Sequence, residues 1–234
     1  GGREIASSSW TYEHGKDGII LSREDPNFAR QHPADYLKGA ELTIKRTLSA
    51  AKRVVNNFSP NQVIGVGVDF TASTPLPVDR RGKPLAFSER FEDNPDALAW
   101  LWKDHTAVAE AEEITNMARR NRPQFLAKCG GAYSCEWYFS KILRCMRTSP
   151  SVFNAAYTWV EAADWIPAVL TGTDMPEKII IGICQAGHKA MFNPEWGGYP
   201  DEKFLKQIDP RIGELRSRMP SKAQDISKSV GGVC

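Results

Sequence analysis

Two short stretches of the sequence combine polar groups that suit an oxygen-rich ligand. Residues 68–74 pass from β-branched into small hydroxylated residues, so that main-chain amides and hydroxyls follow an expected strand. Residues 101–106 place Asp104 and His105 after Trp102. A carboxylate can accept hydrogen bonds from ligand hydroxyls, and an indole ring can cover an apolar C–H face. A plain strand-to-turn transition and an Asp helix cap beside a packed Trp remain the structural alternatives.

Two further stretches lie where a helix begins and where a strand ends. In YSCEW, Glu136 precedes Lys141 by five residues, so the two do not form the usual ion pair of a helix face. In AGHKA, which follows the apolar run 179–183, Lys189 offers a cation beside the hydrogen-bonding ring of His188. A capped, half-buried helix and a solvated loop are the alternatives for these two stretches.

The overall composition is typical of a soluble globular domain. Of the 234 residues 41% are hydrophobic, and 30 Lys and Arg against 28 Asp and Glu give a formal charge of +2. Both signs are interspersed, which favours neither a nucleic-acid nor a membrane partner. The five cysteines form no CxxC pair, and no apolar run reaches the roughly 18 residues of a membrane span. We therefore expect a cytoplasmic protein with reduced thiols, and the sequence leaves its oligomeric state open.

Helical and strand patterns alternate along the chain, which predicts an α/β fold around a mixed sheet. Apolar residues at three- and four-residue spacing, Ala- and Glu-rich composition and capping residues mark the helices. The expected helices cover 33–55, 106–120, 134–147 and 151–163. The expected strands cover 3–12 at a sheet edge, 63–70 at the centre and 179–183. Turn residues at 78–85 predict a hairpin with Gly82 at the position that needs a positive φ.

No single stretch identifies an enzyme, since neither a Walker-type phosphate loop, a GxGxxG motif nor a GxSxG elbow is present. The order of the stretches is more specific. It runs VDFTAST, LWKDHTA, YSCEW with a lysine after it, VEAADWIP before LTG, and AGHKA. From about Gln31 to Arg218, this order resembles the ribulokinases of the FGGY carbohydrate kinase family.

The resemblance implies a ribonuclease H-like domain of the actin-like ATPase fold, with a mixed sheet flanked by helices. Residues 1–234 would form an incomplete amino-terminal, sugar-binding domain, without the carboxy-terminal nucleotide-binding domain. The complete enzyme would transfer the γ-phosphoryl group of ATP, with Mg²⁺, to the 5-hydroxyl of L-ribulose in L-arabinose catabolism. A kinase of another pentulose, D-ribulose or D-xylulose, and a non-catalytic sugar-binding module are the alternatives.

The resemblance also implies roles for particular residues. Thr71 and Ala72 match positions whose main chain contacts the sugar. Lys189 matches a lysine that meets sugar oxygens, and Asp104 matches the Trp-x-Asp aspartate that lines the pocket. The further candidates are His105, Glu136 and Trp137.

The resemblance places the remaining catalytic parts outside this sequence. The catalytic aspartate is expected beyond Cys234, and the Asp-x-Gly-Thr phosphate loop is expected before Gly1. The chain alone is therefore expected to be inactive, to contain no catalytic residue or metal ligand, and to bind neither ATP nor Mg²⁺ tightly.

Overall fold

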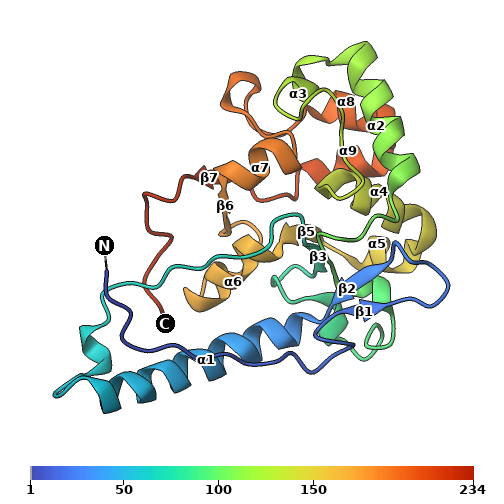
Figure 1. Cartoon of the computed structure of the whole chain (residues 1–234). Coiled ribbons are helices and arrows are strands. Elements are labelled where there is room, and N and C mark those ends of the chain that lie inside the picture. The colour runs from blue at the N-terminus through green and yellow to red at the C-terminus, as the bar shows by residue number, and fades with distance from the viewer. Residues whose placement is uncertain (1) are drawn as a thin grey trace.

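The computed structural model describes residues 2–234, with the side chain of His188 excepted, and shows helices around three small sheets (Figure 1). The largest sheet is antiparallel and has the order β1-β2-β4, formed by Ile20–Leu21, Ala29–Gln31 and Ala99–Trp100. An antiparallel pair joins β3 (Pro75–Val78) to β5 (Thr158–Glu161), and a parallel pair joins β6 (Ile180–Gly182) to β7 (Lys222–Gln224). The expected α/β class is confirmed, although the described strands are divided among small sheets.

Helices cover both ends of the molecule. The α-helices of the described residues are α1 (Pro33–Val54), α2 (Val108–Asn121), α3 (Gln124–Ala127), α4 (Tyr138–Thr148), α5 (Pro150–Ala155), α6 (Ala162–Leu170), α7 (Ile183–Lys189), α8 (Glu202–Ile208) and α9 (Pro210–Arg216). Figure 1 shows α1 along the base and α2, α3, α8 and α9 at the opposite end, with β3 and β5 between them. The strand pair next to two of the expected motifs, VDFTAST before β3 and VEAADWIP at the end of β5, therefore lies in the middle of the fold.

The expected helix over 33–55 is confirmed as α1. Pro33 occupies its first position, and the His32 imidazole accepts a hydrogen bond from the Ala34 amide at 3.2 Å. A proline lacks the amide hydrogen that the first turn leaves without a partner, so this start is favourable. Tyr36 and Gly39 are buried, which places one face of the helix against the rest of the protein. The expected helix over 106–120 and the expected strand over 179–183 are likewise confirmed, as α2 and β6.

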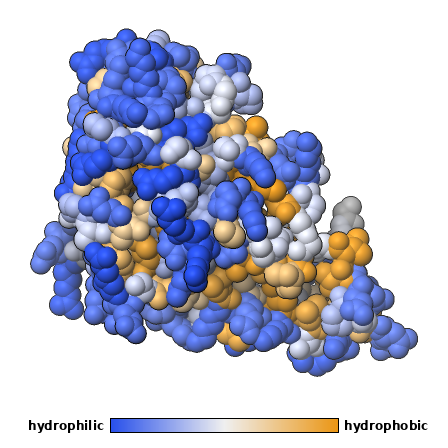
Figure 2. All heavy atoms as spheres, turned by 180° about the vertical axis from the view of Figure 1, so that it is seen from behind, coloured by the Kyte–Doolittle hydropathy of each residue, from blue (hydrophilic) through white to orange (hydrophobic). Residues whose placement is uncertain are grey.

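Two expected strands are wrong. Residues 3–12 and 63–70 belong to no sheet. Ile64 is fully exposed and Val66 is about half exposed, and no described segment pairs with this backbone. Because a strand is held by hydrogen bonds to a neighbouring strand, an apolar β-branched sequence without such a neighbour does not form one. Figure 2 shows apolar residues reaching the surface over the lower half of the molecule.

The expected helix over 151–163 is also wrong, because a strand interrupts it. α5 ends at Ala155 and α6 begins at Ala162, and between them β5 is buried throughout. Val160 lies opposite Leu76 in the antiparallel register with β3. Packing on both faces of this strand outweighs the helical pattern of the surrounding sequence. This strand is what carries Glu161 into the centre of the protein.

The helix expected from Ser134 begins four residues later, at Tyr138, with Trp137 in the N-cap position. Ser134 instead holds a turn, since its hydroxyl accepts a hydrogen bond from the Glu136 amide at 3.2 Å. Such local hydrogen bonds compete with helix formation. Glu136 therefore lies before the helix and not in its first turn.

The turn of the hairpin expected at 78–85 is present, and Gly82 has a φ of 77°. A single bridge joins Val78 to Pro84, while the chain continues into a 3₁₀ turn at Leu85–Phe87, so the second hairpin strand is not formed. The Gly82 carbonyl accepts a hydrogen bond from the Trp165 indole at 3.0 Å. This turn therefore holds α6 against the strand pair.

Replacing Gly82 with alanine is expected to lower the free energy of unfolding by about 1 to 3 kcal/mol. A Cβ atom at this position would lie 1.7 Å from the Asp174 carbonyl oxygen, and the positive φ is unfavourable for any L residue. Urea denaturation followed by circular dichroism measures the change. Gly65→Ala is the control, because a Cβ there meets nothing within 4 Å. Equal stabilities of the two variants would contradict the expectation.

Candidate functional site

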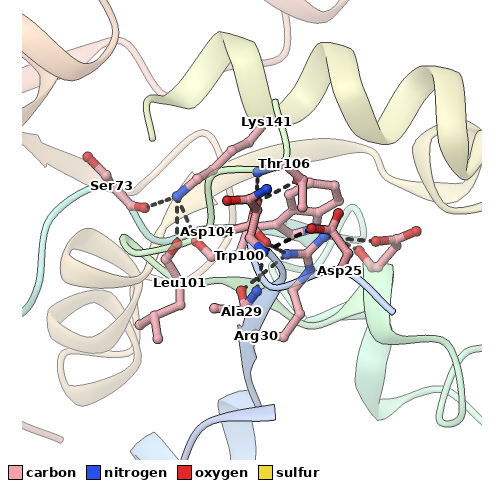
Figure 3. Close-up of polar contacts among 11 residues, drawn as sticks. Asp25, Ala29, Arg30, Ser73, Trp100, Leu101, Asp104, Thr106 and Lys141 are labelled. Atoms are coloured by element: carbon pink, nitrogen blue, oxygen red, sulfur yellow. Dashed lines mark hydrogen bonds and ion pairs between the residues drawn. The ribbon is translucent and has the colours of Figure 1, made fainter. Parts of the chain in front are cut away.

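A buried lysine on α4 connects two of the expected motifs. The Lys141 side chain is fully buried, and its ammonium group donates hydrogen bonds to the carbonyl oxygens of Ser73 and Leu101, both at 2.7 Å, and of Trp100 at 3.2 Å (Figure 3). These carbonyls come from the chain just before β3 and from the end of β4. A lysine has three donors and no acceptor, so all of its hydrogen-bonding groups are satisfied by main chain.

A buried carboxylate stands close to this lysine in the same core. Glu161, at the end of β5, accepts a hydrogen bond from the Thr74 amide at 2.8 Å, while its other carboxylate oxygen has no hydrogen-bond partner in the described structure. Burial lowers the pKa of Lys141 and raises the pKa of Glu161, because both charged forms lose their hydration. The attraction between the two charges opposes both shifts. Their protonation states are therefore linked.

The chain from Thr71 to Thr74 forms a tight turn between this pair. Ser73 is buried and adopts a φ of 66°, in the left-handed region that non-glycine residues rarely enter. The Thr74 hydroxyl donates a hydrogen bond to the Thr71 carbonyl at 3.1 Å. Thr71 itself is exposed and Ala72 is half-buried, so the main chain of these two candidates lies at the surface end of the turn.

Asp104 is enclosed by partners from β2 and from its own turn (Figure 3). Its carboxylate forms an ion pair with Arg30, accepts a hydrogen bond from the Ala29 amide at 2.8 Å, and accepts one from the Thr106 hydroxyl at 2.7 Å. The guanidinium group of Arg30 also lies over the Trp100 ring at 3.4 Å from its centroid. Asp104 is fully buried, and its visible role is to order the turn that carries His105. Its role in lining a sugar pocket stays a prediction.

The other candidates come together through side chains at the start of α4. The His105 ring lies 3.0 Å from the Glu136 carboxylate, which joins the second motif to the third. The Lys189 ammonium lies 5.5 Å from the centre of the Trp137 ring, which joins the third to the fourth. His105, Glu136 and Lys189 all retain partial exposure. These contacts bring partly exposed donors and acceptors of the second, third and fourth motifs close together.

The main chain of Lys189 is also held in place by a hydrogen bond. It is the last residue of α7, and the buried Tyr133 hydroxyl donates a hydrogen bond to its carbonyl oxygen. The motif is expected just after the strand over 179–183, and the structure places it in α7, which follows β6 and ends at Lys189 with Ala190 as its C-cap residue. The solvated-loop alternative for this stretch is therefore wrong.

Three buried charged groups near the site were missed by the sequence analysis as candidates. Arg30, Lys141 and Glu161 follow or interrupt apolar residues, and each is nearly or fully buried. Charged residues are rarely buried without a specific partner. A charged residue inside an apolar pattern is therefore the signal that could have found them, but their partners are distant in sequence.

The described residues show neither a cluster of metal-binding side chains nor a membrane-spanning helix. Among residues 2–234, leaving aside the His188 side chain, no three His, Cys, Asp or Glu side chains are grouped to hold a metal ion. No helix within the described part of the chain is long and apolar enough to cross a bilayer.

Known proteins with similar sequences are sugar kinases of one kind. The ribulokinase of Vibrio parahaemolyticus serotype O3:K6 is 39% identical over 231 residues, which cover 98% of this chain and 40% of the relative. The ribulokinase of Shouchella clausii is 39% identical over 218 residues, which cover 92% of this chain and 37% of the relative. The chain thus spans about two fifths of the length of the curated relatives that it matches. No family model matches the chain.

Solved structures of sugar and polyol kinases share the fold. The xylulose kinase of Rhodospirillum rubrum superimposes with a TM-score of 0.66 at 16% identity, covering 92% of this chain and 39% of that one. The Plasmodium falciparum glycerol kinase superimposes with a TM-score of 0.66 at 14% identity, over 92% of this chain and 39% of that one. These structures show the actin-like ATPase fold expected from the motifs. In the order of its motifs and in its identity to curated relatives over nearly its whole length, the chain is similar to ribulokinases, and it shares its fold with the sugar kinases above.

Proposed function

We propose that this chain is the sugar-binding part of a cytoplasmic kinase that phosphorylates L-ribulose. In the proposed reaction the 5-hydroxyl oxygen of L-ribulose attacks the γ-phosphorus of ATP, the bond to the β–γ bridging oxygen breaks, and the hydroxyl proton leaves to a base. The products are L-ribulose 5-phosphate and ADP. Mg²⁺ would supply neutralisation of the phosphate charge. The observation that supports the proposal best is that all four candidate motifs converge around the start of α4 in a chain 39% identical to ribulokinases.

The chain's own residues are proposed to bind and orient the sugar. The main chain of Thr71 and Ala72 would contact the sugar, and the Lys189 ammonium would donate hydrogen bonds to sugar oxygens. His105 and Glu136, already paired, offer a donor and an acceptor at the same surface. Asp104 would act through the turn that it orders. Fixing a hydroxyl in line with a phosphoryl group contributes a large part of catalysis in phosphoryl transfer.

Replacing Lys189 with alanine is expected to weaken L-ribulose binding about tenfold to a hundredfold, the loss expected for a hydrogen bond from a charged donor. Titration of the protein with L-ribulose, followed by tryptophan fluorescence, measures this. Trp137, one of the seven tryptophans, lies beside the lysine and contributes a signal from this position. Lys203→Ala, on the exposed side of α8, is the control with the same change of charge.

The same titration with D-ribulose and D-xylulose tests the choice of substrate. Preferential binding of either of these pentuloses would contradict L-ribulose as the substrate. A coupled ADP-release assay on the longest open reading frame that contains the chain tests the phosphoryl transfer. Saturable sugar binding without any ADP release from that product would contradict the kinase proposal and favour a binding module.

A further inference from the structure

We infer that Lys141 and Glu161 are positioning residues that together hold the Thr71–Thr74 turn in the shape that the sugar meets. The inference rests on the proposed function and adds two residues to it, neither of which touches the surface where the candidate sugar contacts lie. Four observations support it: a fully buried ammonium group, a strained turn, a clamp on both sides of that turn, and links to the other candidate residues.

Lys141 lies in the protein core, where a charged group is unfavourable unless specific partners stabilise it. Its side chain is fully buried, as are those of the next two residues of α4, Ile142 and Leu143. Replacing a buried charge by a well-packed apolar residue often leaves stability unchanged or raises it. All three of its hydrogen bonds go to main-chain carbonyls from segments about 40 and 68 residues away. This arrangement fixes the position of backbone, which an apolar residue cannot do.

The backbone at Ser73 adopts a conformation that its neighbours must stabilise. Its φ of 66° is unfavourable for a residue with a Cβ atom, and its hydroxyl has no hydrogen-bond partner in the described structure. Strained residues of this kind persist only where the surroundings hold them, and they concentrate at functional sites. The turn therefore depends on its neighbours for its shape.

Lys141 and Glu161 hold this turn from two sides. The ammonium group binds the Ser73 carbonyl at 2.7 Å, and the Glu161 carboxylate accepts the amide of the next residue, Thr74, at 2.8 Å. One group thus fixes the oxygen and the other fixes the nitrogen of the same peptide linkage. The two charges also attract each other, and each favours the charged form of the other. The exposed Thr71 and half-buried Ala72 are presented from the end of this clamped turn.

The same pair reaches the other candidate residues. The Lys141 ammonium holds the Leu101 carbonyl, three residues before Asp104, and so fixes the start of the turn that carries His105. Glu161 also interacts electrostatically with Lys189. One buried pair therefore sets the relative positions of three segments that are separate in sequence. A displacement of about 1 Å at such a site is enough to change turnover about a hundredfold.

The test uses the kinase encoded by the longest open reading frame that contains the chain, with L-ribulose and ATP varied separately. Lys141→Met is expected to raise the KM for L-ribulose about tenfold or more and to leave the KM for ATP unchanged. Lys203→Met, with the same change of charge on an exposed face, is expected to change neither. An unchanged KM for L-ribulose in Lys141→Met, or an equal change in both KM values, would overturn the inference.

A second substitution separates positioning from general damage to the core. Ser73→Gly removes the strain, because glycine adopts a positive φ without penalty. It is expected to recover part of the lost affinity in Lys141→Met. Glu161→Gln keeps the shape and the acceptor for the Thr74 amide while it removes the charge, and it is expected to raise the KM for L-ribulose about threefold. Additive effects of Ser73→Gly and Lys141→Met, with no recovery, would contradict a clamp.

Failure of the proposed function can be distinguished from failure of the positioning role. If the unmodified protein neither binds nor phosphorylates L-ribulose, the proposed function is wrong. If it does both and the Lys141 and Glu161 variants behave as it does, the proposed function stands and only the positioning role is wrong. Direct titration of each variant with L-ribulose, beside its thermal unfolding curve, identifies a variant that has simply unfolded, in which case Glu161→Gln decides.

Discussion

Replacing Asp104 with alanine is expected to lower the free energy of unfolding by about 3 to 5 kcal/mol. The substitution leaves the guanidinium group of Arg30, which is 1% exposed, without its fully buried partner. It also removes the acceptor of the Ala29 amide and of the Thr106 hydroxyl, so β2 and the turn before α2 both lose a contact. A buried polar group without a partner is unfavourable by more than the hydrogen bond contributed. Urea denaturation followed by tryptophan fluorescence measures the loss.

Two further variants show whether the loss comes from the unpaired charge. Asp96, which is 21% exposed and contacts the Nη2 atom of Arg30 at 3.0 Å, is the control, and Asp96→Ala is expected to lose about 1 kcal/mol. In a protein that carries Arg30→Met as well as Asp104→Leu, most of the loss is expected to be recovered, because no charge stays buried. A loss below about 1 kcal/mol for Asp104→Ala would show that water reaches the Arg30 side chain.

The second large effect concerns pH and Asp164. This residue of α6 is buried, and its carboxylate accepts hydrogen bonds from the Gly182 amide at 2.8 Å and from the Gln185 side chain at 2.6 Å. Burial raises the pKa of Asp164 to about 8, with the nearby Glu161 acting in the same direction. The folded protein therefore binds a proton here between about pH 4 and pH 8 that the unfolded chain releases.

The sign of the effect follows from this difference in bound protons. Its contribution to stability is fully present below the ordinary pKa of an aspartate and is lost as the pH rises towards 8. Each unit of pKa difference corresponds to about 1.4 kcal/mol, so the loss amounts to a few kcal/mol. Asp164→Asn keeps an oxygen acceptor for Gly182 and does not titrate. We expect its stability relative to the unmodified protein to rise steadily from pH 4 to pH 8.

Urea denaturation at half-unit steps of pH, on both proteins, measures this difference. Asp225→Asn is the control, because hydrogen bonds from the hydroxyl and the amide of the exposed Ser227 lower the pKa of Asp225 and keep its titration below this window. A constant difference between Asp164→Asn and the unmodified protein across the range would show that Asp164 is ionised in the folded state at low pH. The Gly182 amide would then be its main stabilising partner.

Local sequence determined the elements that depend on local interactions. The spacing of apolar residues and Pro33 predicted α1, the Ala- and Glu-rich composition predicted α2, and the turn residues predicted the positive φ of Gly82. Each of these features is stabilised by contacts within about four residues, which a single sequence shows directly. The order of the motifs was equally readable, because it depends on residue identity and not on distance.

Tertiary structure decided everything that depends on a distant partner. The apolar run 63–70 is not a strand because no described segment pairs with it, whereas β5, inside an expected helix, is a strand because β3 does. The clamp around Ser73 is formed by Lys141 and Glu161, whose sequence separations from it are 68 and 88 residues. Hydrogen bonds and buried charges across such separations follow from how the chain packs, and residue types along the sequence carry no record of that geometry.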